Sequence, residues 1–173
     1  MENEKPTFNV ATICPPMIYG PLDHDASLDH LNTSSADIYR LMNGSQEEPG
    51  PTAFPGTMPP LISIAPNTDL IVVAFADVRD VGEAHVMAYE NPQSSRHLIT
   101  TGNFQYPDVC AIIKKALPTY ASKVPDPSST EKVETFALDN SHARNALGLH
   151  FTPLDQTVSD TAKSLARLQE AKA

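Results

Sequence analysis

Glycine is scarce in this sequence, with seven glycines among 173 residues. No two of them are two or three positions apart, so the chain has no glycine-rich turn of the kind that binds a dinucleotide. It also has no P-loop, no G-x-S-x-G elbow, no H-E-x-x-H zinc motif and no C-x-x-C pair. These shortages exclude the common catalytic frameworks, and we predict no catalytic residue within the chain.

The sequence also lacks a tyrosine followed four residues later by a lysine. In such a pair the lysine cation lowers the pKa of the phenol, and both groups reach the same substrate oxygen. The residues four positions after the five tyrosines are Asp23, Asn43, Gln93, Cys110 and Val124. Tyr120 and Lys123 are one position too close, and they lie in a linker between prolines, where a helix is disfavoured.

Cysteines and long apolar runs are few. The two cysteines, Cys14 and Cys110, are far apart in the sequence, which predicts buried thiols in a reducing compartment. The longest apolar run, Leu70 to Ala76, has seven residues, far below the roughly 20 that cross a bilayer. The first residues show no signal-peptide pattern. We therefore expect a cytoplasmic protein with no membrane segment.

Basic residues are fewer than acidic residues: the chain has 12 Lys and Arg and 21 Asp and Glu, which gives a formal net charge of −9. Nucleic-acid binding needs a clustered positive face, so we predict no such partner. One loop gathers carboxylates and imidazoles, namely Asp23, His24, Asp25, Asp29 and His30. These groups suit zinc or manganese, but no ligand set has a recognisable spacing. We favour a solvated loop and predict no metal.

Proline, in contrast, is abundant, with 16 residues. Six prolines lie between positions 49 and 66, a segment that can form neither a regular helix nor a central strand. This segment divides the chain, and we predict three regions: 1–48, 49–76 and 77–173.

Hydrophobic periodicity predicts alternating strands and helices. The expected strands span 8–14, 70–76 and 96–101, with a short extended piece at 135–138. The expected helices span 28–42, 77–90, 106–117, 140–147 and 152 to near the end, with a loop over 15–29 and a polar linker over 118–133. This order predicts an α/β fold. A buried parallel strand such as 8–14 needs neighbours on both sides, so the sheet is incomplete.

The helix expected after Asp77 carries several charged groups. We predict that Asp77 caps this helix, and that Arg79 and Asp80 act in capping and pairing rather than as acid or base. His85 is expected to be a packed or surface histidine rather than a catalytic one.

Several segments resemble one enzyme family in order and spacing. They read F-N-V-A-T-I-C-P-P-M-I-Y-G-P at 8–21, H-L-N-T-S at 30–34, D-V-R-D-V-G-E-A-H at 77–85, R-H-L-I-T-T at 96–101, D-N at 139–140 and L-G-L at 147–149. Together they resemble the carboxyl-terminal half of an extended short-chain dehydrogenase/reductase of the NAD-dependent epimerase/dehydratase type. The similar branch includes dihydroflavonol reductases, cinnamoyl-type reductases and fungal methylglyoxal or ketone reductases.

The resemblance implies an incomplete Rossmann-type sheet with the small substrate-binding subdomain of such an oxidoreductase. Region 1–48 would hold the last Rossmann strand with a substrate and cofactor loop and a helix, 49–76 a proline-rich insertion and strand, and 77–173 the substrate-binding region. Family members reduce a ketone or aldehyde with NADPH.

The resemblance also implies site residues. Pro15 and the backbone of Ile18 would border the nicotinamide, and Ser34 would touch the cofactor phosphates or ribose. Met17 and Tyr19 would help line a mostly apolar pocket for a small carbonyl substrate.

Two departures from the family pattern limit the expected activity. The family places its glycine loop and its Tyr-x-x-x-Lys pair upstream of the strand that starts here at Phe8, so we expect weak or no NADPH binding and no hydride transfer by this chain alone. About 20 extra residues precede Asp77, as a retained intron or a misdrawn gene model would produce. The alternative is a non-catalytic interaction or ligand-binding protein that pairs with a separate Rossmann chain.

Overall fold

A computed structural model describes residues 8–49, 73–91, 95–129 and 137–171. Most of the proline-rich region, and with it most of the suggested insertion, lies outside these residues. So do the first part of the strand expected at 70–76 and the first two residues of the extended piece at 135–138. The boundaries proposed at 48 and 76 therefore stay predictions.

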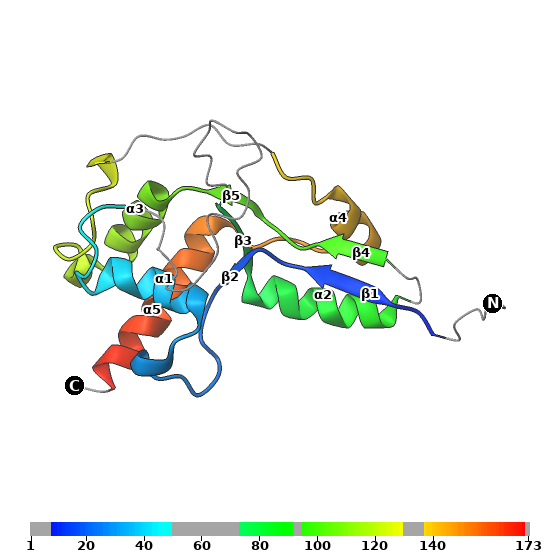
Figure 1. The fold of residues 1–173 in the computed structure, drawn as a ribbon, viewed down its shortest axis with the longest axis horizontal. Helices are drawn as coiled ribbons and strands as arrows, with labels where there is room; N and C mark the ends of the chain where they lie inside the picture. The colour runs from blue at the N-terminus through cyan, green and yellow to red at the C-terminus, as the bar shows by residue number, and fades with distance from the viewer. Residues whose placement is uncertain (1–7, 50–72, 92–94, 130–136, 172–173) are drawn as a thin grey trace, which may run out of the picture.

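The described residues form a mixed α/β fold (Figure 1). The strands are β1 (Ala11–Cys14), β2 (Met17–Tyr19), β3 (Val73–Asp77), β4 (Ser95–Leu98) and β5 (Gly102–Phe104). The α-helices are α1 (Thr33–Met42), α2 (Val78–Glu90), α3 (Tyr106–Ala116), α4 (Ser141–Leu147) and α5 (Leu154–Glu170). Three short 3₁₀ turns span Leu28–His30, Pro118–Tyr120 and Pro127–Ser129.

The strands form two small sheets. β1 and β4 pair in parallel, and β3 lies between β2, its parallel neighbour, and β5, its antiparallel neighbour. In Figure 1 the β1–β4 pair lies toward the amino terminus with α2 and α4, whereas α1, α3 and α5 gather at the other end. The incomplete sheet that the sequence predicts is confirmed.

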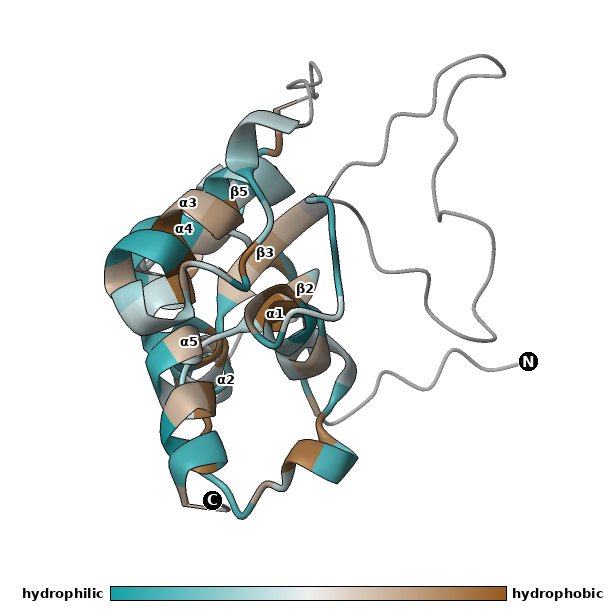
Figure 2. Cartoon of the chain, turned by 90° about the vertical axis from the view of Figure 1, so that its left-hand side faces the viewer, coloured by the Kyte–Doolittle hydropathy of each residue, from teal (hydrophilic) through white to brown (hydrophobic). Residues whose placement is uncertain are grey.

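Each end has its own hydrophobic core. The larger core packs α1, α3 and α5 against β2, β3 and β5, and its fully buried members include Ile38, Ile113 and Leu165. The smaller core packs α2 and α4 under β1 and β4 around Ala84 and Ile99. Figure 2 shows α1 end-on beside β2 and β3 at the larger core. β2 and β3 therefore lie between the two cores.

The predicted helices are confirmed, with shifted boundaries at their starts. Asp77 caps α2 by accepting a hydrogen bond from the Arg79 amide, and Gly148 ends α4 with φ of 69°. The helix expected from residue 28 begins at Thr33, because residues 28–30 form a separate 3₁₀ turn. No helix of the described ranges has the length and apolar character to span a membrane.

Three local predictions were wrong. The loop expected over 15–29 contains strand β2, because three residues there pair with β3. The strand expected at 96–101 ends at Leu98, and the chain resumes pairing as β5. The strand expected to be buried over 8–14 begins at Ala11, and residues 8–12 are exposed. Of the two expected buried thiols, Cys110 is buried and Cys14 is half-buried, and neither forms a disulfide.

Candidate functional site

Four of the five predicted site residues lie where the chain passes from one sheet to the other. β1 ends at Cys14, Pro15 follows it, and β2 begins at Met17. Residues 15–18 are half-buried, while Tyr19 is buried. The structure therefore brings together the predicted cofactor residues Pro15 and Ile18 and the predicted substrate residues on one short segment.

Alternation along β2 separates these residues into two sets. Met17 and Tyr19 pack on the larger core, and Ile18 packs on the smaller core, because successive side chains of a strand point to opposite faces. Tyr19 lies opposite Asp77 and Ile18 opposite Ala76 in the parallel pairing with β3. The residues predicted to contact the substrate thus share one face, away from Ile18.

Ser34 lies apart from this segment, in the first turn of α1. It is 6% exposed, and its hydroxyl accepts a hydrogen bond of 3.0 Å from the side-chain amide of Asn32. Ser34 is therefore carried by a different element from the other four predicted site residues.

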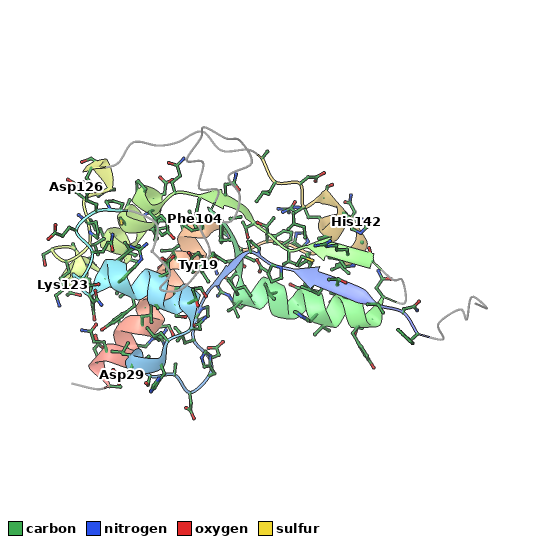
Figure 3. All side chains as sticks on the ribbon, viewed as in Figure 1. Tyr19, Asp29, Phe104, Lys123, Asp126 and His142 are labelled. Atoms are coloured by element: carbon green, nitrogen blue, oxygen red, sulfur yellow. The ribbon has the colours of Figure 1, made fainter. Side chains whose placement is uncertain are left out.

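Tyr19 belongs to a buried polar network. Its hydroxyl donates to a carboxylate oxygen of Asp37 on α1 at 2.6 Å, and the hydroxyl of Tyr106 donates to the same oxygen at 3.0 Å. The Arg40 Nε donates to the other oxygen at 3.0 Å. Phe104 stands edge-on to both tyrosine rings, with centroids 5.5 Å apart. Figure 3 labels Tyr19 and Phe104 between the strands and α1.

This network keeps Tyr19 neutral. Burial raises the pKa of Tyr19 far above its ordinary value, and the negative charge of Asp37 raises it further. Burial and Asp37 also raise the pKa of Tyr106. A phenol held this way donates a hydrogen bond but releases no proton near neutral pH, so Tyr19 acts in this network as a hydrogen-bond donor.

A second network fixes the carboxyl ends of β2 and β3. Asp77 is fully buried and accepts hydrogen bonds from the Arg79 side chain and the Thr157 hydroxyl. Arg79 also pairs with Asp160 at 2.9 Å, and the Thr161 hydroxyl accepts from the Gly20 amide at 2.8 Å. α5 is therefore tied both to the start of α2 and to the residue that follows β2.

Burial raises the pKa of Asp77, but hydrogen bonds from Arg79 and Thr157 outweigh it and hold the pKa below its ordinary value. Asp80, next on α2, accepts from the amide and hydroxyl of Thr152. The motif D-V-R-D therefore works by capping and pairing, as the sequence predicts. The N-cap position of α5 is Pro153, and the hydroxyl of Thr152 donates to Asp80.

A cavity of about 320 Å³ opens just beyond Gly20. It lies between the loop from Pro21 to Ala26 and the carboxyl end of α5, and its polar lining includes Asp23, His24 and Arg167. None of the five predicted site residues lines it. Within the described ranges, no group of three or more His, Cys, Asp or Glu is placed to hold a metal.

His85, singled out in the sequence, is exposed on α2, and its Nδ1 lies 2.7 Å from the carbonyl oxygen of Val81 in the preceding turn. The surface placement that the sequence predicts is confirmed. Asp37 is the residue of this site that sequence reasoning missed. Its only signal was a carboxylate on an otherwise amphipathic helix.

No model of a protein family matches the chain. The ketoreductase azaE of Aspergillus niger is 32% identical over 171 residues, a match that covers 95% of this chain and 46% of that protein. The NADPH-dependent methylglyoxal reductase GRE2 of Saccharomyces cerevisiae is 27% identical over 169 residues, with 94% of this chain and 44% of that protein matched. The crystal structure of Gre2 from Candida albicans with NADPH superposes with a TM-score of 0.71 at 27% identity and covers 96% of this chain.

The chain is a homologue of the carboxyl-terminal half of extended short-chain dehydrogenase/reductases. It spans less than half the length of the curated relatives it matches. The family resemblance inferred from the segments at 8–21, 30–34 and 77–85 is confirmed. The two-sheet arrangement is accordingly a partial short-chain reductase fold.

Proposed function

We propose that this chain forms the substrate-binding part of an NADPH-dependent carbonyl reductase and that it transfers no hydride by itself. The observation that carries the proposal is the match to a ketoreductase along 95% of the chain. The likeness to a Gre2 structure that contains NADPH supports the choice of cofactor. The substrate class, a small ketone or aldehyde, follows from the names of these relatives.

In this proposal one face of β2 contacts the cofactor and the other contacts the substrate. Ile18, on the side of the smaller core, and Pro15, just before β2, would border the nicotinamide, and Ser34 at the start of α1 would reach the ribose or a phosphate. Met17 and Tyr19 would form the substrate wall from the side of the larger core. Because Tyr19 is 2% exposed and bonded to Asp37, Met17 contacts the substrate while Tyr19 holds the wall in place.

The three predicted cofactor residues offer too few hydrogen-bond donors for a whole dinucleotide. Pro15 has no amide hydrogen, so among the three predicted cofactor residues the donors are the Ile18 amide and the Ser34 hydroxyl, which accepts a bond from Asn32 and keeps its own hydrogen to donate. When bound, NADPH would supply the hydride. These residues alone would orient one edge of the nicotinamide, so the isolated chain should bind the cofactor weakly or not at all.

The proposal is tested with the purified 173-residue chain and a panel of ketones. We expect no saturable NADPH fluorescence change and no NADPH oxidation. The chain lacks the tyrosine–lysine pair that would act as general acid, and general acid catalysis alone increases the rate by about 10² to 10⁴. Co-expression with the amino-terminal half of azaE should restore ketone-dependent oxidation. Rapid turnover by the chain alone overturns its predicted inactivity, and no turnover in the co-expressed pair overturns the reductase assignment.

A second candidate is a non-catalytic protein that binds a partner through its incomplete sheet. The incomplete sheet favours it, since β1 and β4 form a pair of strands with exposed residues such as Leu98, and an uncovered strand can bind a partner. This candidate is supported over the reductase if the chain forms a stable complex with the amino-terminal half of azaE and the complex oxidises no NADPH with any ketone. A cytoplasmic location remains a prediction under both candidates.

A further inference from the structure

Two histidine rings are stacked where α4 packs on β4. The rings of His97 on β4 and His142 on α4 have centroids 5.1 Å apart, and their planes are 10° from parallel. His97 is 2% exposed, whereas His142 is an exposed residue. α4 lies beside β4 in Figure 1, and Figure 3 labels His142 on that helix. His142 therefore helps to cover a buried histidine of the strand.

The surroundings of His97 favour its neutral form. Its Nδ1 is buried and has no hydrogen-bond partner among the described residues. Ile13, opposite His97 in the parallel pairing, packs on the smaller core. A protonated imidazole has two N–H donors, and a buried charge or donor without a partner is costly. Burial accordingly lowers the pKa of His97, and the charge that His142 can carry lowers it further.

The elements that pack around the pair place no described carboxylate against either ring. Arg96 of β4 bonds to Cys14 of β1, and Arg144 of α4 lies over the Phe151 ring at 4.8 Å. The side chains that α2 contributes to the smaller core are apolar. The remaining ionisable groups of α2 and of the segments beside α4 are exposed, namely Glu83, His85, Glu90, Asp139 and His150, or bonded to Thr152, namely Asp80. A positive charge on His97 would therefore be uncompensated.

The other contacts of α4 are modest. The helix has seven residues, of which Ala143 and Leu147 are buried. The Asn140 side chain donates to the Thr100 carbonyl at 2.6 Å, and the Asn91 side chain donates to the Ala146 carbonyl at 3.2 Å. A helix this short is unstable without tertiary contacts. A change in the contact between the two histidines can therefore decide whether α4 stays attached.

We propose that the stacked pair His97–His142 holds α4 on β4 at neutral pH and releases α4 under mildly acidic conditions. Histidine is the side chain whose charge ordinarily changes between pH 5 and 8. While α4 is attached, His97 stays neutral. Once α4 detaches, the His97 ring reaches water and can take up a proton. The detached state binds more protons, so a falling pH shifts the equilibrium toward it.

The test is hydrogen exchange of the full 173-residue chain, followed by NMR at pH 7 and pH 5. The amides of Arg144 and Gly148 donate to carbonyls within the α4 region at 3.0 and 2.9 Å, so their exchange reports the opening of α4. One proton taken up at the ordinary histidine pKa, about 6.5, raises the opening constant by at most about 25-fold between these pH values. Protection factors corrected for intrinsic exchange should therefore fall by about five- to 25-fold. At pH 5 the amides of α5 should stay better protected than those of α4, because α4 opens without the rest of the fold.

Two variants separate the pair from other histidines. His97→Phe keeps a ring in the stack but cannot take up a proton, so the protection of α4 should change less than twofold between the two pH values. His85→Phe makes the same replacement at an exposed position of α2. It is the matched control and should keep the fall seen in the parent.

Unchanged protection of α4 in the parent, or an equal fall in His97→Phe, overturns the proposal. If His97→Phe does not fold, titration of the ring signals of the parent decides. Loss of α4 protection that follows the protonation of His97 supports the proposal. A His97 ring that takes up its proton while α4 keeps its protection overturns it.

Discussion

Asp37 shows what a single residue decides in this protein. Its fully buried carboxylate accepts hydrogen bonds from two phenols and from Arg40, donors on α1, β2 and α3. An ionised group in a core is stable only when it is paired and fully hydrogen-bonded. One carboxylate thus links the proposed substrate wall on β2 to two helices.

Replacing Asp37 with asparagine should destabilise the fold strongly. The substitution removes the charge that pairs with Arg40, whose side chain is 10% exposed, and removing one member of a buried pair costs about 3 kcal/mol or more. Urea unfolding followed by circular dichroism measures the loss. Asp25→Asn, in an exposed loop position, is the control and should leave the midpoint unchanged. An unchanged midpoint for Asp37→Asn would show that the network contributes little.

Sequence reasoning selected Tyr19 but not its partner. Tyr19 stands in a motif beside two prolines, so it stood out, whereas Asp37 looks like any polar residue on a helix. Its donors Tyr19 and Tyr106 lie 18 and 69 positions away in the chain. No local pattern reports a contact between residues so far apart, which is why the network became visible only in the fold.

At the scale of elements, Gly20 ends β2 where no other residue fits. Its φ is +136°, and an added Cβ would lie 2.6 Å from the Val78 Cγ1. Gly20→Ala should therefore lower the free energy of unfolding by more than about 1 kcal/mol. Gly82→Ala is the matched control, since nothing lies within 4 Å of its Cβ position inside α2. It should stabilise the protein by about 0.5–1 kcal/mol. Thermal unfolding of both variants measures the contrast, and a Gly20→Ala variant as stable as the parent contradicts it.

The junction of β3, α2 and α5 should respond to pH through Asp77. Its folded pKa is lowered by hydrogen bonds from Arg79 and Thr157 that exceed the opposing effect of burial. A carboxyl group whose pKa is lower in the folded than in the unfolded state stabilises the fold at pH values above its unfolded pKa, about 3.9. This stabilisation is lost as the pH falls through the folded pKa. The melting temperature of Asp77→Asn should therefore lie below that of the parent at pH 6, with the gap narrowing below pH 4.

Asp155→Asn, at an exposed position in the first turn of α5, is the control and should keep the parent's pH dependence. A gap between Asp77→Asn and the parent that stays constant from pH 7 to pH 3 would show that the charge of Asp77 is irrelevant to the junction.

Helices were predictable where the hydrophobic repeat continues over several turns. The helices α2, α3 and α5 follow apolar positions spaced by three and four residues, and Gly148 marks the end of α4. β2 and β5, with three residues each, were missed because a strand that short exists only through its partner β3.

At the scale of the whole molecule, the two ends should differ in local stability. The larger core holds fully buried side chains from three helices, whereas the β1–β4 pair is covered on one face only and β1 has exposed residues at its start. Regions with few buried apolar contacts open more readily. Hydrogen exchange followed by mass spectrometry should show faster exchange in β1 and β4 than in β3 and α5. Equal protection at both ends would contradict this difference.

The sequence by itself determined the α/β class, the incomplete sheet, most helices and the reductase homology, because these depend on local periodicity and on motifs read in order. The tertiary structure decided which side chains meet. It separated Ile18 from Met17 and Tyr19 by the alternation of β2, bonded Tyr19 to Asp37, and left one face of β1 open. Such arrangements arise from contacts between residues distant in the chain, whose energies depend on packing that no single segment encodes.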